Sequence, residues 1–433
     1  MNELSASPRT HGARIPIHTR WRGVRPLLAI ASVALTLSAC RASGQRPADL
    51  GLPSVSAEEL SARRLNASAL QARLDSVLKR AVRDGAFPAA YAVVGRRSGI
   101  LAQASAGDLG QKGSSPPDVH TLWDLASLTK VVALTSGAIR LVQEGRLDIN
   151  APVQRYLPEW TGPGKDVVTV RHLLTHSSGL PSWRPLYKET TSPAAALELV
   201  MATPLDTIPG VRMVYSDLGA ILLGVVVTRV AGMPFDQLAT QRVFQPLHMR
   251  ETFYRPPASL VPRIAATEVD PWRQRHLRGE VHDENAFALG GISPHAGLFS
   301  SAADLSRLAR MFLNYGTLDG AAVLDSATIV RFTARADGPL SNRALGWEKP
   351  TGTNSAGHLL SPSAFGHTGF TGTSLWIDPA NDVFILLLTN RVNPTRENRR
   401  IGEIRIAVAD AVMATISGCA QRAPLLECAR RKH

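Results

Sequence analysis

The segment Leu122-Trp-Asp-Leu-Ala-Ser-Leu-Thr-Lys-Val-Val132 contains a serine and a lysine three residues apart, Ser127 and Lys130. Residues at positions i and i+3 share a helix face with Cβ atoms about 5–6 Å apart, so the Lys130 amine can reach the Ser127 hydroxyl. The following residues are almost all apolar as far as Val142, which predicts a helix buried on most sides. The segment therefore places a nucleophile beside a candidate base at the start of a core helix.

Burial of Lys130 would suit the role of a base, because a low dielectric disfavours the ammonium form and lowers the pKa of a lysine. The spacing alone is weak evidence, since Ser76 and Lys79 repeat it. That second pair falls on or beside the polar face of an amphipathic helix predicted over residues 70–81, and we interpret it as solvated surface. Other residues must therefore identify the site.

A second candidate segment is Tyr215-Ser-Asp217, which precedes an apolar run over residues 218–230. Ser216 or Asp217 is expected to cap the helix that begins there. Capping does not explain Tyr215. A phenol beside a lysine ammonium can relay a proton to a leaving group, so Tyr215 is a candidate catalytic residue.

The third segment, Gly366-His-Thr-Gly-Phe-Thr-Gly372, comes directly before two predicted strands. Its glycines would let a substrate lie against the strand edge with backbone N–H groups free to bind it. The N–H groups of Ser127 and Phe370 are predicted to form an oxyanion hole. Taken alone, such a run is more often an ordinary turn.

Strands are predicted near both ends of the chain, over residues 89–95, 100–106, 373–378 and 383–389, and a helix follows over 399–417. The region between them is mostly helical with proline-rich loops. This pattern predicts an α+β fold with one sheet built from both chain ends. We assign the α/β part of the domain to residues 67–150 and 343–418, the helical part to 151–342 and a C-terminal tail to 419–433.

Together, the three segments resemble the signature of the serine β-lactamase and penicillin-binding protein superfamily. Further stretches resemble its class C β-lactamase-related branch, which includes D-Ala-D-Ala carboxypeptidases, esterases and muropeptide amidases: Leu147-Asp-Ile-Asn-Ala-Pro-Val153, Val170-Arg-His-Leu-Leu-Thr-His-Ser-Ser-Gly-Leu-Pro181 and Val243-Phe-Gln-Pro-Leu-His-Met249. The resemblance covers residues 67–415. It implies a β-lactamase/transpeptidase-like fold, an antiparallel sheet flanked by helices.

The resemblance also implies roles for individual residues. Ser127 would be the nucleophile, and Lys130 and Tyr215 would act as general base and proton relay. The substrate would lie along His367, Thr368 and Gly369.

Two residues depart from the family pattern. Asp217 stands where the family often has asparagine; its carboxylate cannot donate to a substrate carbonyl, and its charge could keep Lys130 protonated, which would move the base role to Tyr215. His367 stands where β-lactamases have lysine, which weakens attraction for a substrate carboxylate near neutral pH. Both changes argue against an efficient β-lactamase and favour another amide or ester substrate, which Asp217 is expected to help bind.

The stretch from Val281-His-Asp-Glu-Asn-Ala286 to Phe299 resembles a segment of muropeptide amidases and of a carboxypeptidase-like penicillin-binding protein. His282, Asp283 and His295 are expected to contact the substrate or to stabilise loops. No diagnostic ligand spacing points to a metal, and we expect neither a metal nor a cofactor.

The N-terminal residues predict export. Arg20, Arg22 and Arg25 precede an apolar stretch over residues 27–37 that is too short to span a bilayer. Leu37-Ser-Ala-Cys40 resembles a bacterial lipobox, so residues 1–39 would be a lipoprotein signal peptide, Cys40 the acylated N-terminus and 40–66 a spacer. A plain signal peptide with a chance cysteine is the alternative. Cys419 and Cys428 could form a disulfide or remain free thiols.

The formal net charge of +13 does not indicate a nucleic-acid partner. Residues 1–39 carry five arginines and one glutamate, or +4, which leaves +9 on the exported part, and its basic residues are scattered. We expect a protein anchored by lipid to the cell envelope, facing the periplasm or the exterior, with a small molecule or a peptidoglycan fragment as substrate.

The sequence therefore predicts an exported serine hydrolase that forms an acyl-serine on an amide bond of peptidoglycan or muropeptides, of the carboxypeptidase or amidase type. One alternative is an esterase for small acyl esters. Another is a non-catalytic, penicillin-binding-like lipoprotein, against which the intact set of Ser127, Lys130 and Tyr215 argues.

Overall fold

The computed structural model describes residues 53–110, 114–336, 340–352 and 354–418. The predicted signal peptide, Cys40, Cys419 and Cys428 lie outside the described residues. In the described ranges no single helix has both the length and the apolar composition to span a membrane; one pair, Asp217–Ala231 and Phe235–Phe244, meets those criteria only when its members are joined across a 74° bend.

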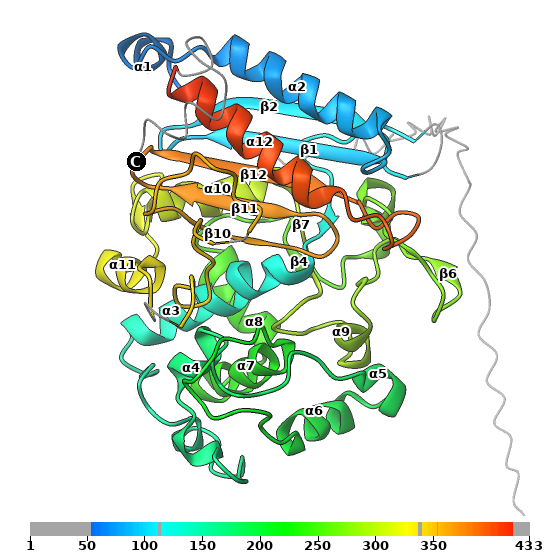
Figure 1. Cartoon of the computed structure of the whole chain (residues 1–433), viewed down its shortest axis with the longest axis vertical. Helices are drawn as coiled ribbons and strands as arrows, with labels where there is room; N and C mark the ends of the chain where they lie inside the picture. Colours follow the sequence, from blue (N-terminus) through cyan, green and yellow to red (C-terminus); the bar gives the residue numbers. More distant parts are fainter. Residues whose placement is uncertain (1–52, 111–113, 337–339, 353, 419–433) are drawn as a thin grey trace, which may run out of the picture. The chain divides into compact units, whose positions relative to one another are not determined.

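A five-stranded antiparallel sheet is built from both ends of the described chain, as predicted (Figure 1). Its strand order is β10-β11-β12-β1-β2. The central contact joins the two chain ends, with Ala90 of β1 opposite Thr389 of β12. The strands are β1 (Ala89–Gly95), β2 (Ile100–Gly107), β10 (Phe365–Thr368), β11 (Ser374–Asp378) and β12 (Val383–Thr389).

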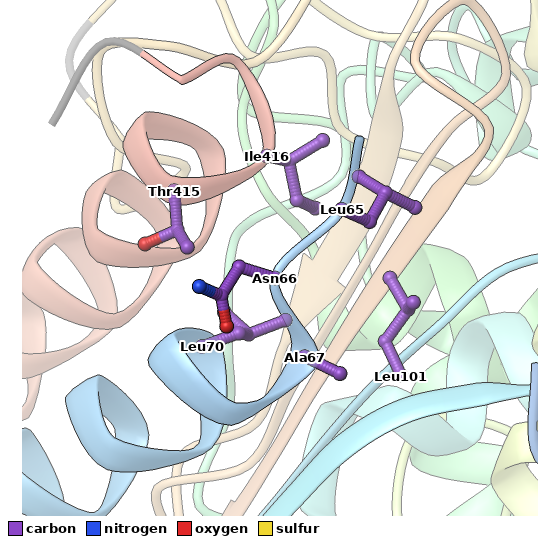
Figure 2. Close-up of a pocket in the computed structure, with 7 residues that line it drawn as sticks. All are labelled: Leu65, Asn66, Ala67, Leu70, Leu101, Thr415 and Ile416. Atoms are coloured by element: carbon purple, nitrogen blue, oxygen red, sulfur yellow. The ribbon is translucent and has the colours of Figure 1, made fainter. Parts of the chain in front are cut away.

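Side chains alternate between the two faces of the sheet, so each face has its own core. Ala90, Ala92 and Val94 join the core under α2 (Ala67–Arg83) and α12 (Ile401–Ile416), two helices that lie side by side on one face (Figure 1). Figure 2 shows the small hollow where the start of α2 meets the end of α12. Ser76 and Lys79 are exposed on α2, as predicted for a surface pair.

The opposite face of the sheet joins a larger core that includes Tyr91, Val93 and Leu128. Helix α10 (Ala302–Leu313) packs against this face, and the helical part of the domain continues the core beyond it. The helical part also contains short strands that were not predicted, among them β4 (Phe253–Tyr254) and β7 (Leu298–Ser300), which form a second sheet with β3 (Trp123–Asp124).

Part of the predicted spacer is ordered against the domain. Ser54 forms a bridge with Ile100, and Val55 is buried. The short helix α1 (Ala57–Ala62) follows, with Ser56 as its N-cap. The chain before α1 therefore contacts the sheet at β2.

The helix after Ser127 is not a regular α-helix at its start. A 3₁₀ turn, η1 (Ala126–Leu128), leads into a π-helix, η2 (Lys130–Thr135), and α3 (Ser136–Gln143) follows. Ala126 has a φ of 46°, a conformation that costs a non-glycine residue about 1–3 kcal/mol. Its N–H donates to Asp124 Oδ1 at 2.9 Å, which helps to hold the turn. Strained residues and π-turns are typical of functional sites.

Candidate active site

Ser127 and Lys130 lie in contact, as their spacing predicted. The Lys130 ammonium donates to Ser127 Oγ at 3.0 Å and to the His295 carbonyl at 2.9 Å. Lys130 is only 3% exposed. A buried cation thus points at the candidate nucleophile.

Ser216, and not Asp217, caps helix α7 (Asp217–Ala231). Ser216 Oγ accepts from the Gly219 N–H at 3.0 Å, so Ser216 is the N-cap. The Asp217 carboxylate is therefore not needed for capping. Its Oδ1 lies 2.7 Å from Lys130 Nζ and forms an ion pair with it.

This ion pair determines the charge of Lys130. Burial alone would lower the pKa of Lys130, but Asp217 and, to a lesser degree, Tyr215 outweigh it, and the pKa is raised above its ordinary value. The expectation that burial makes Lys130 a neutral base is therefore wrong for the resting site. The structure agrees with the other expectation, that Asp217 keeps Lys130 protonated, which leaves Tyr215 as the candidate base.

The Tyr215 ring occupies the centre of the site. Lys130 Nζ lies 5.1 Å and Arg343 Cζ 5.0 Å from the ring centroid. The rings of His176 and His367 have centroids 4.5 and 5.8 Å from that of Tyr215. The buried Tyr215 hydroxyl makes no hydrogen bond of good geometry with a described residue.

His367 is a neutral imidazole. Burial, and then the charges of Arg343 and Lys130, hold its pKa well below the ordinary value. Its Nδ1–H donates to the Thr368 carbonyl at 2.8 Å, so the enclosed Nε2 carries a lone pair and has no partner among the described residues. His367 thus does not replace the positive charge of the lysine found in β-lactamases.

His176 is a site residue to which the sequence analysis gave no role. Its Nδ1 accepts from the Ser216 N–H at 3.0 Å, which leaves Nε2 protonated, and its pKa is lowered by burial and by Arg343 and Lys130. His176 has a φ of 57° and packs on Tyr215. Nothing in the residue type distinguishes it from a core histidine; only its place in the stretch Val170 to Pro181 could have suggested a role.

The loop after β10 docks against the turn before Ser127. Thr371 Oγ1 donates to the Asp124 carbonyl at 2.7 Å, and Thr373 Oγ1 donates to that of Leu125 at 3.0 Å. Gly369 is required here, because a Cβ would lie 2.4 Å from the Leu125 carbonyl oxygen. Its own N–H donates to Thr373. Close packing against Leu125 therefore explains why residue 369 is a glycine. A free backbone N–H group does not explain it, because the Gly369 N–H is already bonded.

The predicted oxyanion hole remains consistent with this geometry. Neither the Ser127 N–H nor the Phe370 N–H donates a hydrogen bond to a described residue. Two arginines fix the loop: Arg405 donates to the Gly369 and Thr373 carbonyls at 2.6 and 2.8 Å, and Arg391 to that of Phe370 at 2.7 Å. Neither arginine was predicted from the sequence.

The two histidines of the 281–299 stretch form hydrogen bonds with protein groups. His282 Nε2 pairs with Glu268 Oε2 at 2.9 Å, and the backbone N–H of His282 donates to Asp124 Oδ2 at 2.7 Å. His295 Nε2 lies 2.9 Å from Asp283 Oδ1, and its Nδ1 lies 2.6 Å from Ser293 Oγ. These contacts support a loop-stabilising role, and substrate contact by either ring stays a prediction.

Potential metal-ligand atoms of Asp217, Asp283 and His295 lie within 4.8 Å of one another. Lys130 contacts Asp217 and the His295 carbonyl. Burial would raise the pKa of Asp283, but His295 and, more weakly, Lys130 hold it below its ordinary value. The negative charge of Asp217 is thus balanced by an ammonium that the chain itself supplies, and Asp283 is paired with His295.

The fold and site define an active-site serine hydrolase in which a serine and a lysine of one segment meet a tyrosine of another. Residues 74–409 match the family model described as Beta-lactamase, and the chain belongs to this family. A relative from Salmonella agona (strain SL483), named "Putative D-alanyl-D-alanine carboxypeptidase", is 33% identical over 313 residues, which are 65% of this chain and 72% of the relative.

Two solved structures share the fold. One is a penicillin-binding protein homologue from Caulobacter crescentus, with a TM-score of 0.65 and 23% identity over 80% of this chain and 97% of that one. The other is EstCE1, described as a hydrolase with promiscuous acyltransferase activity, with a TM-score of 0.64 and 21% identity over 80% of this chain and 99% of that one. At these identities the likeness concerns the fold alone.

Proposed function

We propose that this protein hydrolyses an amide bond of peptidoglycan or of muropeptides through an acyl-Ser127 intermediate, as a carboxypeptidase or an amidase. The contact of Ser127 Oγ with Lys130 Nζ beside Tyr215 is the observation that carries the proposal. The relative from Salmonella agona carries the name "Putative D-alanyl-D-alanine carboxypeptidase", which supports the substrate class.

In the proposed reaction, Tyr215 acts as a phenolate. Ser127 Oγ attacks the carbonyl carbon of the amide, and the hydroxyl proton of Ser127 passes to the Tyr215 oxygen. The Lys130 ammonium, 3.0 Å from Oγ, stabilises negative charge that develops on the attacking oxygen. The N–H groups of Ser127 and Phe370 hold the oxyanion. Tyr215 then protonates the leaving nitrogen, the C–N bond breaks, and water hydrolyses the acyl-serine.

We further propose that the protein is exported and anchored in the cell envelope by lipid on Cys40, facing the periplasm or the exterior. This rests on the arginines before residues 27–37 and on the lipobox-like Leu37-Ser-Ala-Cys40. Cell fractionation with metabolic labelling by a fatty acid tests it. Label on the wild type and none on Cys40→Ser supports the anchor, and equal label on both refutes it.

The alternative substrate is a small acyl ester. The neutral His367 favours it, because an ester substrate needs no cation at the position where β-lactamases have lysine. The same serine, lysine and tyrosine would serve either bond.

A substrate panel separates the two. Wild type and Ser127→Ala are assayed with purified muropeptides, D-Ala-D-Ala peptides and p-nitrophenyl esters, with products identified by mass spectrometry. Serine-dependent release of D-alanine supports the carboxypeptidase form of the proposal. Serine-dependent release of N-acetylmuramic acid supports the amidase form. Turnover confined to esters would overturn the cell-wall substrate.

A further inference from the structure

Four aromatic side chains form a continuous row beside the active site, here called the aromatic ridge: Trp183, Tyr187, Trp272 and Phe287. Successive ring centroids along this row lie 6.4, 4.7 and 5.9 Å apart. Trp183, Trp272 and Phe287 are 47%, 40% and 36% exposed, and Tyr187 is partly exposed. The proposed reaction uses none of these rings, and contiguous exposed apolar surface is typical of a binding site.

The ridge is assembled from segments that are far apart in the sequence: α5 (Leu186–Glu189) with the residues before it, the turn between β5 (Val269–Asp270) and β6 (Arg275–His276), and α9 (Glu284–Ala288). Helices α5 and α9 lie side by side (Figure 1). Asn285 on α9 joins them, because its side chain accepts from the Tyr187 N–H at 3.3 Å and donates to the Arg184 carbonyl at 2.8 Å. Hydrogen bonds between the segments therefore hold the rings in one row.

A buried guanidinium supports half of the ridge. Arg273 Cζ lies 5.7 Å from the ring of Trp272 and 5.0 Å from that of Phe287. The Arg273 side chain is 3% exposed and donates to the Val281 and His282 carbonyls at 2.7 and 2.6 Å. Because the guanidinium is itself fixed, the two rings stacked on it are held ready for a ligand, which lowers the entropic cost of binding.

Both ends of the ridge border the active site. The carbonyl of the residue just before Trp183 accepts from the Asp217 N–H at 2.9 Å. At the other end, Arg396 donates to Glu284 of α9 at 2.7 Å, and its Cζ lies 6.0 Å from the ring centroid of Phe370, which belongs to the predicted oxyanion hole. A molecule bound on the ridge would therefore lie next to the acyl group that Ser127 receives.

The charges that flank the ridge are mostly paired with one another: Arg184 with Glu189 at 2.5 Å, Arg275 with Glu280 at 2.6 Å and Arg396 with Glu284 at 2.7 Å. Lys188, whose Nζ lies 5.7 Å from the Tyr187 ring centroid, adds one positive charge. Such a surface lacks the cluster of four or more basic residues that is typical of binding to anionic lipids. Aromatic faces with paired charges at their rim match a neutral ligand that has both apolar and hydroxyl surface.

A pyranose ring has this chemistry. Its C–H groups form an apolar face that packs on an aromatic ring, and its hydroxyl and acetamido groups point outward, where charged side chains at the rim can bind them. A row of rings at successive separations of 6.4, 4.7 and 5.9 Å suits several sugars in a chain better than a single sugar.

We propose that the aromatic ridge binds the sugar rings of a β-1,4-linked, N-acetylated glycan, so that the enzyme prefers acyl substrates that are still joined to sugar. The inference rests on the proposed action of Ser127 on peptidoglycan or muropeptides, and it names the part of the substrate that lies outside the reacting bond.

Binding of chitotetraose, a neutral β-1,4-linked oligomer of N-acetylglucosamine, tests the ridge without turnover. The dissociation constant is measured by titration calorimetry on the full chain carrying Ser127→Ala. We expect saturable binding that Trp272→Ala or Trp183→Ala, added to Ser127→Ala, weakens by about 10-fold or more, the scale of a lost aromatic contact. Trp272→Tyr should keep part of the affinity, because it retains an aromatic face.

Tyr315→Ala is the matched control, since Tyr315 is 41% exposed and lies outside the ridge, after α10. It should bind chitotetraose as the parent does, and urea unfolding of every variant checks the fold. Absence of binding at about 10 mM sugar would overturn the proposal, as would unchanged affinity in both tryptophan variants. Vesicles of phosphatidylethanolamine and phosphatidylglycerol, and sedimentation of the protein alone, test other occupants. Ridge-dependent vesicle binding or dimerisation without sugar binding would also refute the proposal.

Turnover of two substrates keeps this test separate from that of the proposed function. If chitotetraose binds through the ridge while no muropeptide is hydrolysed, the ridge stands and the proposed function fails. If wild type hydrolyses a disaccharide-peptide and the same peptide without sugar at equal kcat/KM, and chitotetraose does not bind, the function stands and the ridge fails.

Discussion

The Asp217 carboxylate lies 2.7 Å from the Lys130 ammonium, and this ion pair keeps protonated the lysine that touches Ser127. The lysine is therefore better suited to stabilise charge on Ser127 Oγ than to accept its proton in the resting site. Tyr215, whose ring centroid lies 5.1 Å from Lys130 Nζ, is therefore the proposed base.

Asp217→Asn should lower the pKa of Lys130, because burial then acts without the opposing carboxylate. The proposed mechanism needs Lys130 as an ammonium, so the basic limb of kcat/KM against pH should move to lower pH in this variant. The profile is measured with a p-nitrophenyl ester. An unchanged profile would show that Asp217 does not control the charge of Lys130.

The same variant should be less stable near neutral pH. A folded-state pKa raised above the ordinary 10.5 contributes stability that is fully present below pH 10.5 and lost above it. Breaking a buried pair costs about 3–5 kcal/mol if the remaining charge persists, and less if Lys130 becomes neutral. Urea unfolding at pH 7 measures the difference, and equal stability of both proteins would contradict it.

Ser127→Ala should abolish covalent labelling by an activated phosphonate and lower turnover by at least about 10³-fold, because no acyl-serine can form. Ser76→Ala is the matched control, since it alters the second S-x-x-K pair on the exposed face of α2. Labelling is followed by intact-protein mass spectrometry. Equal labelling of wild type and Ser127→Ala would end the proposed mechanism.

Gly369→Ala should lower kcat by about 10²–10³-fold, the usual effect of losing one oxyanion-hole donor. The new Cβ would lie 2.4 Å from the Leu125 carbonyl oxygen and 2.1 Å from Thr373 Oγ1, so the loop that carries Phe370 must move. Gly402→Ala in α12 is the control, as its Cβ meets no atom within 4 Å. Wild-type kcat in Gly369→Ala would argue against the oxyanion hole.

Acid should destabilise the loop network around Glu268. Burial would raise the pKa of Glu268, but His282 and Arg396 lower it to about 2 from 4.5. A lowered pKa contributes stability that is present above pH 4.5 and lost as the pH falls toward 2. Glu268→Gln should lose less stability than the wild type over that interval, as measured by urea unfolding. Glu58→Gln, at an exposed site, should follow the wild type.

Much of the fold could be predicted because local patterns encode it. Runs of apolar residues bounded by turns predicted β1, β2, β11 and β12 within one or two residues of their ends, and the S-x-x-K spacing predicted the contact of Ser127 with Lys130. The short strands β4 and β7 escaped prediction, because a two- or three-residue strand has no period to detect.

The sequence by itself determined the strands of the main sheet and the candidate catalytic residues, because helix and strand periods and i, i+3 spacing are local properties of the chain. Only the tertiary structure decided the charges in the site. Ser216 rather than Asp217 caps α7, which frees the Asp217 carboxylate to pair with Lys130. Arg343 reaches Tyr215 from a segment far along the chain. Such effects depend on distance and burial in space, which no local pattern records.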